Sequence, residues 1–479
     1  MADITDVKLD QSPAADPQKL GLMGLIGVVA GSMIGGGIFN LPSNMASTAG
    51  AGAVLIAWVV TAVGMYFLAS TFKALSNARP DLSSGIYAYA REGFGGFMGF
   101  EMAWGYWLSA AFGNVAFAVL IMDTLGYFFP VFKDGSMASL LGGSILIWFM
   151  HFVVLRGVSA AASLNVVATI AKLVPAAVII IALIVAFDAN VFQQDFWGHS
   201  EKIGSPMEQM KGTMLVTLWA FIGIEGAVVV SGRAKSPKSV GVATLTGLFV
   251  CLFIYVLISV LPFGIMHEPE MAGLKSPSAA YVLEKIVGPW GATFVNAGVL
   301  IALLSCWLSW TILVPEVPFE AAKGGAFPKK FAEVNTNGSP AIALWVSSIV
   351  MQIMLVAAHF SSDAWNFLLS ITGVMVLPPY LASAAFLCQY SKSHGNSIAF
   401  VTGLMASIYA VWLLYAAGPS YLLMSTVIFA LGIAVYWMSY KEKSDAGSFL
   451  QGNERWIATL LILVAIASIA MFAMGKITI

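Results

Sequence analysis

Thirteen long apolar stretches make up most of this chain, and each is long enough to cross a membrane as a helix. About 20 helical residues span the ~30 Å hydrocarbon core of a bilayer. Charged residues make up only 10% of the sequence, whereas soluble domains carry about 25%. The sequence therefore predicts an all-α integral membrane protein of 12 or 13 spans. The apolar stretches are 21–49, 51–72, 97–130, 137–155, 159–187, 207–231, 241–266, 288–322, 340–360, 364–390, 397–417, 419–440 and 456–475.

The basic residues are unevenly distributed between alternate loops, and this sets the expected orientation. Of the 23 Lys and Arg, 16 lie on the side of the N-terminus, 6 on the other side, and Lys172 lies within a span. Because basic loops stay in the cytoplasm, we expect a cytoplasmic N-terminus and a cytoplasmic (inner) membrane location. Residues 1–20 hold four aspartates and no apolar core of a signal peptide, so they are predicted to be a cytoplasmic tail.

Several classes of function do not fit this composition. The net charge of −1 with scattered bases lacks the basic stripe of a nucleic-acid-binding protein. The three cysteines and five histidines are dispersed along the chain, without the spacing of a metal site or a catalytic motif. We therefore expect no enzyme activity, no metal, no cofactor and no nucleic-acid partner.

A glycine cluster stands in the middle of the first apolar stretch, at Gly31, Gly35, Gly36 and Gly37. Each glycine weakens a helix by ~1 kcal/mol relative to alanine, so the cluster predicts a break. In lipid, a broken helix is tolerated only where the freed backbone groups face protein or a cavity. The alternative is a packing ladder of Gly27, Gly31 and Gly35, which needs neither Gly36 nor Gly37.

The sixth stretch carries a second candidate break, where Glu225 stands between Gly223 and Gly226. A charged acid in mid-membrane costs ~2.5–3.5 kcal/mol and usually marks a functional site. Breaks five helices apart are typical of two inverted five-helix repeats with a binding site between them. The expected parts are a first repeat at 21–187, a second at 207–390 and C-terminal helices at 397–475.

The two breaks would present complementary backbone groups. A half-helix that starts near Gly37 points free N–H groups and its positive end at the gap, which suits a carboxylate. A half-helix that ends near Ile222 offers free carbonyls, which suit an ammonium group. Together they predict a site for the zwitterionic head of an amino acid. Aromatic residues that could pack on its side chain are Tyr106, Trp107, Trp219, Trp307 and Trp310.

Five long motifs resemble the amino acid–polyamine–organocation superfamily. They are GSMIGGGIFNLPSNMA (31–46), SSGIYAYAREGFG (83–95), AWGYWLSAAFGNVAF (103–117), TLWAFIGIEGAVVVSGRAKSPKSVG (217–241) and EVPFEAAKGGAFPKKF (316–331). Within the superfamily the chain is most similar to the basic amino acid/polyamine antiporters, in particular the arginine/ornithine branch. The resemblance implies a LeuT-like fold with discontinuous helices 1 and 6 and alternating access. It also implies exchange of an amino acid for its metabolic product.

The resemblance also implies roles for individual residues. The loop from Ser32 to Gly37 would hold the carboxylate, and the Ile222 carbonyl the α-amino group. Trp219 and Trp310 would sandwich the side-chain stem. The implied substrate-binding set is Ser32, Met33, Gly35, Gly36, Gly37, Ala110, Asn114, Trp219, Ile222, Trp310 and Thr372, and the implied gating set is Tyr87, Tyr106, Glu225 and Tyr380.

Some positions depart from these patterns. Compared with arginine/agmatine exchangers, Ser32 and Gly36 stand where an Asn and a Ser are usual, and Ala110 replaces a larger residue. Lys172 is the one basic residue within a span. It is either an internal cation, protonatable or fixed, or a structural partner of backbone carbonyls. Glu101 lies outside the motif roles and is predicted to be an interfacial anchor.

The leading expectation is a transporter that exchanges arginine or lysine for ornithine or a related product. Two alternatives keep the same fold. One is an exchanger of an amino acid for its decarboxylated amine, such as histidine/histamine or lysine/cadaverine, and the other is a proton-coupled permease. The expected partners are amino acid substrates and the lipid bilayer, with a homodimer implied by related exchangers.

Overall fold

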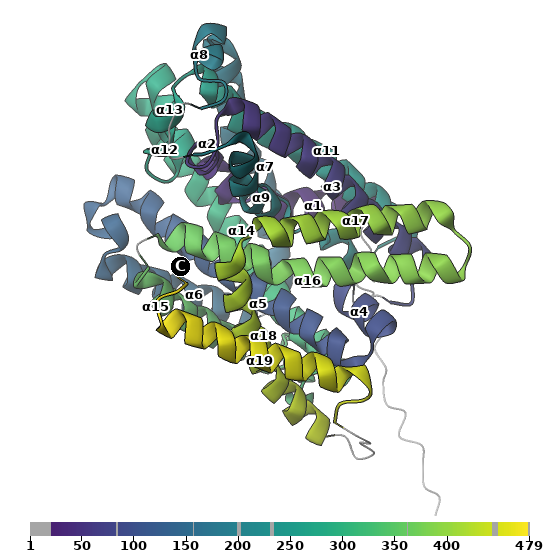
Figure 1. Ribbon diagram of the computed structural model, residues 1–479. Helices are drawn as coiled ribbons and strands as arrows, with labels where there is room; N and C mark the ends of the chain where they lie inside the picture. The colour runs from purple at the N-terminus through teal and green to yellow at the C-terminus, as the bar shows by residue number, and fades with distance from the viewer. Residues whose placement is uncertain are drawn as a thin grey trace, which may run out of the picture.

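The computed structural model describes residues 21–82, 85–156, 158–198, 203–229, 234–361, 363–442 and 449–477. Within this part of the chain the regular elements are helices (Figure 1). Eleven of them are long and apolar enough to cross a membrane, and a bent pair forms a twelfth such segment. The 29-residue helix α7 stands where the fifth apolar stretch was predicted. These findings confirm the all-α membrane fold.

The long helices follow the predicted order. The first five segments are α1 (Leu22–Met33) with η1 (Gly36–Asn40) and α2 (Leu41–Ala46), α3 (Ala51–Ala78), α5 (Gly96–Phe128), α6 (Met137–Leu155) and α7 (Val158–Ala186). The next five are α9 (Pro206–Phe221) with α10 (Gly226–Val229), α11 (Pro237–Val260), α14 (Pro289–Lys323), α15 (Ala341–His359) and α16 (Ala364–Ser393). The last three are α17 (Ser397–Ala416), α18 (Pro419–Lys441) and α19 (Asn453–Ala473).

Short helices connect these segments. We call the side at which α1 begins the inner side, after the predicted orientation, and the opposite side the outer side. The inner side carries α4 (Ile86–Phe94) and η5 (Lys329–Ala332). The outer side carries η2 (Pro130–Gly135), α8 (Ala189–Gln194), η4 (Leu261–Gly264), α12 (Glu268–Ala272) and α13 (Ser278–Val287).

Contacts between the first five and the next five segments come in matched pairs. Helix α1 packs on α11, and α9 packs on α3; likewise α5 packs on α16, and α14 packs on α7. The first segment packs on the seventh as the sixth packs on the second, and the third packs on the tenth as the eighth packs on the fifth. Such pairing is expected of two structural repeats related by a pseudo-two-fold axis.

The short helices α4 and α13 extend this correspondence. Each is followed by a glycine with positive φ, Gly95 (φ 94°) and Gly288 (φ 88°), and then by a long helix, α5 or α14. A glycine adopts this backbone conformation without steric cost, so the chain can reverse sharply there. Each short helix packs on the long helix that follows it. Neither helix was predicted from the sequence, because a half-polar helix of this length gives no membrane-span signal.

Buried hydrogen bonds join helices of the first five segments to helices of the next five. Thr61 on α3 bonds to Thr217 on α9 at 2.8 Å. Trp107 on α5 donates to Ser347 on α15 at 2.9 Å, and His151 on α6 bonds to Ser348 on α15 at 2.9 Å. These helices are therefore held together by polar contacts as well as apolar packing.

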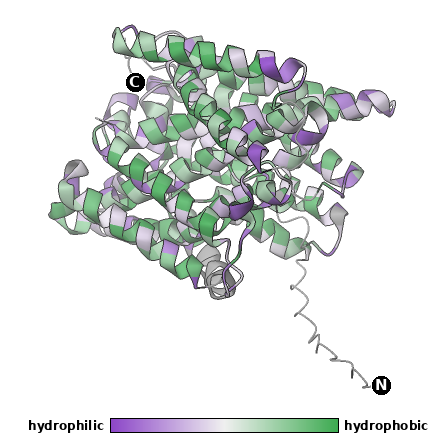
Figure 2. Ribbon diagram, turned by 90° about the horizontal axis from the view of Figure 1, so that it is seen from below, coloured by the Kyte–Doolittle hydropathy of each residue, from purple (hydrophilic) through white to green (hydrophobic). Residues whose placement is uncertain are grey.

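The outside of the bundle is apolar, as Figure 2 shows by the hydrophobic colouring along most helices. Large side chains such as Val185 (82% exposed), Phe253 (67%) and Ile353 (65%) lie on that surface. Soluble proteins rarely expose apolar surface on this scale. The chain is a multi-pass membrane protein.

Candidate functional site

The first transmembrane segment is broken between Met33 and Gly36. Ile34 ends α1, Gly35 is extended, and the axes before and after the break differ by 43°. The missing side chains of two glycines leave space for neighbours. A Cβ on Gly36 would lie 2.2 Å from Leu303, and one on Gly37 only 1.9 Å from Trp219. A Cβ on Gly27 would meet no neighbouring helix within 4 Å, so the packing-ladder alternative does not explain the cluster.

The second break lies beside the first. Helix α9 ends at Phe221, Ile222 is extended, and Gly223 has a φ of 107° before α10 begins at Gly226. The hydroxyl of Ser32 lies 2.9 Å from the carbonyl oxygen of Gly223 and 3.0 Å from that of Val29. Ser32 can therefore donate from one break to the other.

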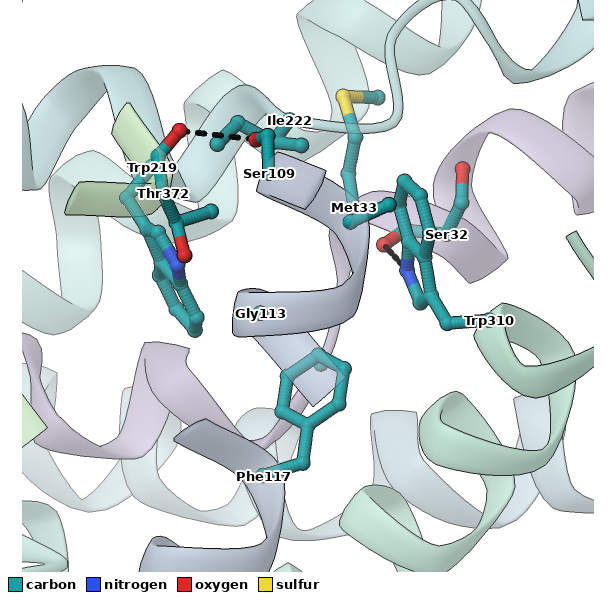
Figure 3. Close-up of a pocket in the computed structure, with 11 residues that line it drawn as sticks. Ser32, Met33, Ser109, Gly113, Phe117, Trp219, Ile222, Trp310 and Thr372 are labelled. Atoms are coloured by element: carbon teal, nitrogen blue, oxygen red, sulfur yellow. Dashed lines mark hydrogen bonds between the residues drawn. The ribbon is translucent and has the colours of Figure 1, made fainter. Parts of the chain in front are cut away.

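A cavity opens between the two breaks and the face of α5 (Figure 3). Eight of the eleven residues that line it belong to the predicted substrate-binding set. None of the lining side chains is charged. The lining residues are Ser32, Met33, Gly35, Ser109, Ala110, Gly113, Phe117, Trp219, Ile222, Trp310 and Thr372.

Two tryptophans form opposite walls of this cavity, one on each side of the α5 turn that carries Gly113 (Figure 3). The indole of Trp310 donates to the Ser32 carbonyl at 3.4 Å. The indole of Trp219 packs edge-on against Phe117, at 6.2 Å between ring centres. Aromatic faces of this kind attract cations and pack on aliphatic chains.

Several polar groups beside the cavity have no partner among the described residues. Both side-chain polar atoms of Asn114 and the hydroxyl of Thr372 are buried and unbonded. Ser109 donates to the Thr372 carbonyl at 2.8 Å. Buried polar groups are nearly always bonded, so the unpaired atoms fit a site that pairs with a solute.

A layer of three side chains closes the inner side of the cavity. Tyr106 donates to one oxygen of Glu225 at 2.5 Å, and Tyr380 to the other at 2.7 Å. The backbone N–H of Gly223 also donates to Glu225, at 3.2 Å. Glu225 is fully buried, and three donors serve its two oxygens. The structure thus brings three of the predicted gating residues into direct contact.

The fourth predicted gating residue, Tyr87, lies apart from this layer on α4 at the inner side. Its hydroxyl accepts from Arg91 at 3.2 Å, and a Cβ on Gly324, at the end of α14, would lie 2.6 Å from it. Burial raises the pKa of Tyr87, and the positive charge of Arg91 opposes this shift.

Lys172 lies beside the last turn of α1, on the inner side of the first break. The residue is 1% exposed, and its ammonium group donates to the Gly31 carbonyl at 2.6 Å. This carbonyl lies in the last turn of α1, where helix carbonyls lack partners. The structure therefore shows the backbone contact that one of the two sequence hypotheses requires.

The predicted set and the observed lining differ at a few positions. Gly36, Gly37 and Asn114 do not line the cavity; Gly36 and Asn114 each follow a lining residue in the chain, and Gly37 lies against the Trp219 ring. The prediction missed Ser109, Gly113 and Phe117. Helical spacing from Tyr106 would have found them, because residues three or four apart share a helix face.

The expectation for Glu101 is wrong. It was predicted to be an interfacial anchor, but its side chain is only 3% exposed within the helix bundle. Helix α18 packs on α5, and its Tyr436 lies against Phe97 in the first turn of α5, one turn before Glu101. Sequence patterns do not show that a later helix covers an earlier one.

Two helices broken side by side around an aromatic-walled cavity are typical of secondary transporters, which hold a solute midway through the membrane. The fold and site define a membrane transporter. Residues 20–416 match the family described as "Amino acid permease". The chain therefore belongs to the amino acid permease family, within the amino acid–polyamine–organocation superfamily, and is a transporter rather than an enzyme.

Relatives cover almost the whole chain. It is 50% identical to the "Arginine/agmatine antiporter" of Chlamydia pneumoniae over 96% of its length and 98% of the relative's. The protein of the same name from Chlamydia abortus is also 50% identical, over 96% and 98% of the two chains. The one from Chlamydia trachomatis serovar L2 is 47% identical, over 96% and 97%.

Proposed function

We propose that this protein exchanges arginine for agmatine, the decarboxylated amine of arginine, by alternating access. The observation that carries this proposal is the near full-length similarity to relatives named for that exchange. The cavity supports it, because its walls are aromatic and its lining side chains carry no charge. Because no lining side chain carries a fixed positive charge, the cavity does not repel either arginine or the more positively charged agmatine.

The proposed pose follows the backbone groups at the breaks. The carboxylate of arginine is held by the N–H groups of Gly36 and Gly37, which open η1 and have no acceptor within it. The α-amino group donates to the Ile222 carbonyl. The side chain lies between Trp219 and Trp310. Its guanidinium pairs with Asn114 and Thr372, whose polar atoms are otherwise unbonded. Agmatine lacks the carboxylate and so loses only the contacts to η1.

In the proposed cycle the layer of Tyr106, Glu225 and Tyr380 separates the cavity from the inner side. Tyr87 forms a second barrier nearer the inner surface. Lys172 holds the end of α1 in place through the Gly31 carbonyl. The moving parts belong to two inverted repeats, 21–187 and 207–390, and the matched helix contacts support this division. The helices at 397–475 pack outside them.

Ornithine is the second candidate for the exported product. The motifs that resemble the arginine/ornithine branch favour it, and so do Ser32 and Gly36, which differ from the usual residues of arginine/agmatine exchangers. We propose a cytoplasmic N-terminus in an inner membrane, on the strength of the 16 basic residues on that side. A homodimer stays a prediction.

Counterflow into proteoliposomes separates these products. Liposomes that hold the purified protein are loaded with agmatine, ornithine, histamine or buffer alone, and uptake of labelled arginine is followed. We expect fast uptake with internal agmatine and slow uptake with buffer. Uptake driven by ornithine alone would move the assignment to that product. Equal uptake into liposomes loaded with buffer would contradict exchange.

A further inference from the structure

Glu101 is a buried carboxyl group that the proposed transport cycle does not use. It lies in the second turn of α5, is 3% exposed, and neither of its oxygens has a hydrogen-bond partner. Glu225 differs in this respect, because its two oxygens accept from three donors. In the described part of the chain, no other carboxyl has both oxygens buried and unbonded.

Glu101 lies on the face of α5 that packs against α18 and borders α16, away from the cavity. Residues one turn before and after it on α5 show this direction. Phe97 packs on Tyr436 of α18 with 5.4 Å between ring centres, and a Cβ on Gly105 would lie 2.5 Å from Phe429 of α18. Residues four apart lie on one face of a helix. Figure 1 shows α18 alongside α5, and the two helices are in contact.

The ionisable groups on the surrounding helices have other partners or lie elsewhere. Arg91 of α4 packs against Gly99, on another face of α5, and bonds to Tyr87. Tyr380 of α16 bonds to Glu225, and Glu454 at the start of α19 accepts from the Phe97 N–H. The remaining ionisable residues of these helices are Tyr89 and Glu92 on α4, Cys388, Tyr390 and Lys392 on α16, Tyr421, Tyr436, Tyr440 and Lys441 on α18, and Arg455 on α19. None of them bonds to Glu101.

An ionised carboxylate without a partner is strongly disfavoured in such surroundings. Burial of an unpaired charge costs several kcal/mol, and the group takes up a proton instead. A neutral carboxyl fits the apolar seam between α5 and α18. Its proton would leave only when water reaches this seam.

We propose that Glu101 is a proton-binding site of this transporter, separate from the substrate cavity. It holds a proton in the conformation described here, where it is buried, and exchanges that proton with water when the α5–α18 seam opens. Glu101 precedes Tyr106 by five residues, about 7.5 Å along the helix axis. Proton binding there favours the closed seam, so the conformational equilibrium of the transporter depends on pH.

The test uses the purified full chain as wild type, Glu101→Gln and Glu101→Met. Both variants are neutral and close in size to a protonated Glu. Difference infrared spectroscopy near pH 7 detects the C=O stretch of protonated carboxyl groups. We expect a band in the wild type that both variants lack. An identical band in wild type and variants would overturn the proposal.

Thermal unfolding gives a second readout, which remains if one variant fails to fold. A proton bound in the folded state and absent from the unfolded state makes stability fall as pH rises. As the pH rises from about 5 to about 9, we expect the melting temperature of the wild type to fall relative to that of either variant. Variants that melt below the wild type by the same margin at every pH would contradict the proposal. Neither readout requires arginine exchange, so failure of the proposed function would be recognised separately.

Discussion

The hydroxyl of Ser32 lies 2.9 Å from the carbonyl oxygen of Gly223, so one side chain links the two broken helices that border the cavity. Ser32 also lines the cavity, and its own carbonyl accepts from Trp310. The positions of both breaks and of one aromatic wall are therefore coupled through a single residue.

Replacement of Ser32 by alanine removes the link between the breaks. A buried hydrogen bond contributes about 1 kcal/mol, so we expect Ser32→Ala to weaken arginine binding about fivefold. Ser309→Ala is the matched control, because the Ser309 hydroxyl bonds only within its own helix. Equal binding of arginine by the wild type and Ser32→Ala would show that the link does not shape the site.

Trp219 is predicted to be the main wall for the substrate side chain. We expect Trp219→Leu to lower arginine exchange at least tenfold, or ~1.4 kcal/mol, because the leucine side chain offers no aromatic face. Trp437→Leu, at a 45% exposed position on α18, controls for the loss of a tryptophan. Initial rates of labelled arginine uptake measure both. Wild-type kinetics in Trp219→Leu would place the substrate elsewhere.

A pair of glycine substitutions tests the close approach of Trp219 to the first break. A Cβ on Gly37 would overlap the Trp219 ring at 1.9 Å, whereas a Cβ on Gly27 meets nothing within 4 Å. Gly37→Ala must displace the indole, so we expect at least a tenfold loss of arginine affinity. Gly27→Ala should bind like the wild type. Similar affinities of the two variants would refute this packing.

The inner layer is predicted to act as a unit. Glu225→Ala, Tyr380→Phe and the double variant form a cycle, with exchange rate as the readout. We expect Glu225→Ala to lower exchange at least tenfold. Tyr380→Phe should add little once Glu225 is gone, because its hydroxyl donates to that carboxylate. Additive losses would mean that the two residues contribute independently.

Glu268, in the short outer helix α12, gives a prediction for pH. It is 3% exposed with one unbonded oxygen. Burial raises the pKa of Glu268, and the nearby charge of Asp195 raises it further. A raised pKa in the folded state means that stability is lost as pH rises through it.

We therefore expect Glu268→Gln to melt above the wild type at neutral pH, with a difference that shrinks as the pH falls towards about pH 4. Glu270→Gln is the control, since Glu270 is exposed and paired with Lys285. A Glu268→Gln protein that melts below the wild type at neutral pH would rule out the expected sign.

The sequence was sufficient to predict the breaks and the order of the spans. Both depend on local physics: runs of apolar residues fix the spans, and the glycines around Gly36 and Gly223 interrupt them. The contact of Glu225 with Tyr106 and Tyr380 required the family resemblance, because the three residues lie on α5, α16 and the sixth segment. Helix periodicity alone does not show which distant helices meet.

Other features depend on packing that the sequence does not reveal. Phe117 shares a face of α5 with Tyr106, so helical spacing points to it, but which helices enclose that face depends on packing. Glu101 looked like a surface anchor because charged residues near span ends usually are. Only its coverage by α18 shows that it is buried. The substrate and gating roles of the predicted residues remain predictions, including those of Gly36, Gly37 and Asn114, which do not line the cavity.

The central claim is that arginine binds between Trp219 and Trp310. Calorimetric titration of arginine into the purified wild type and Trp219→Leu tests it most directly, with Trp437→Leu as the control. We expect one arginine per chain in the wild type and in Trp437→Leu, and binding at least tenfold weaker in Trp219→Leu. Equal affinity in all three proteins would contradict the account.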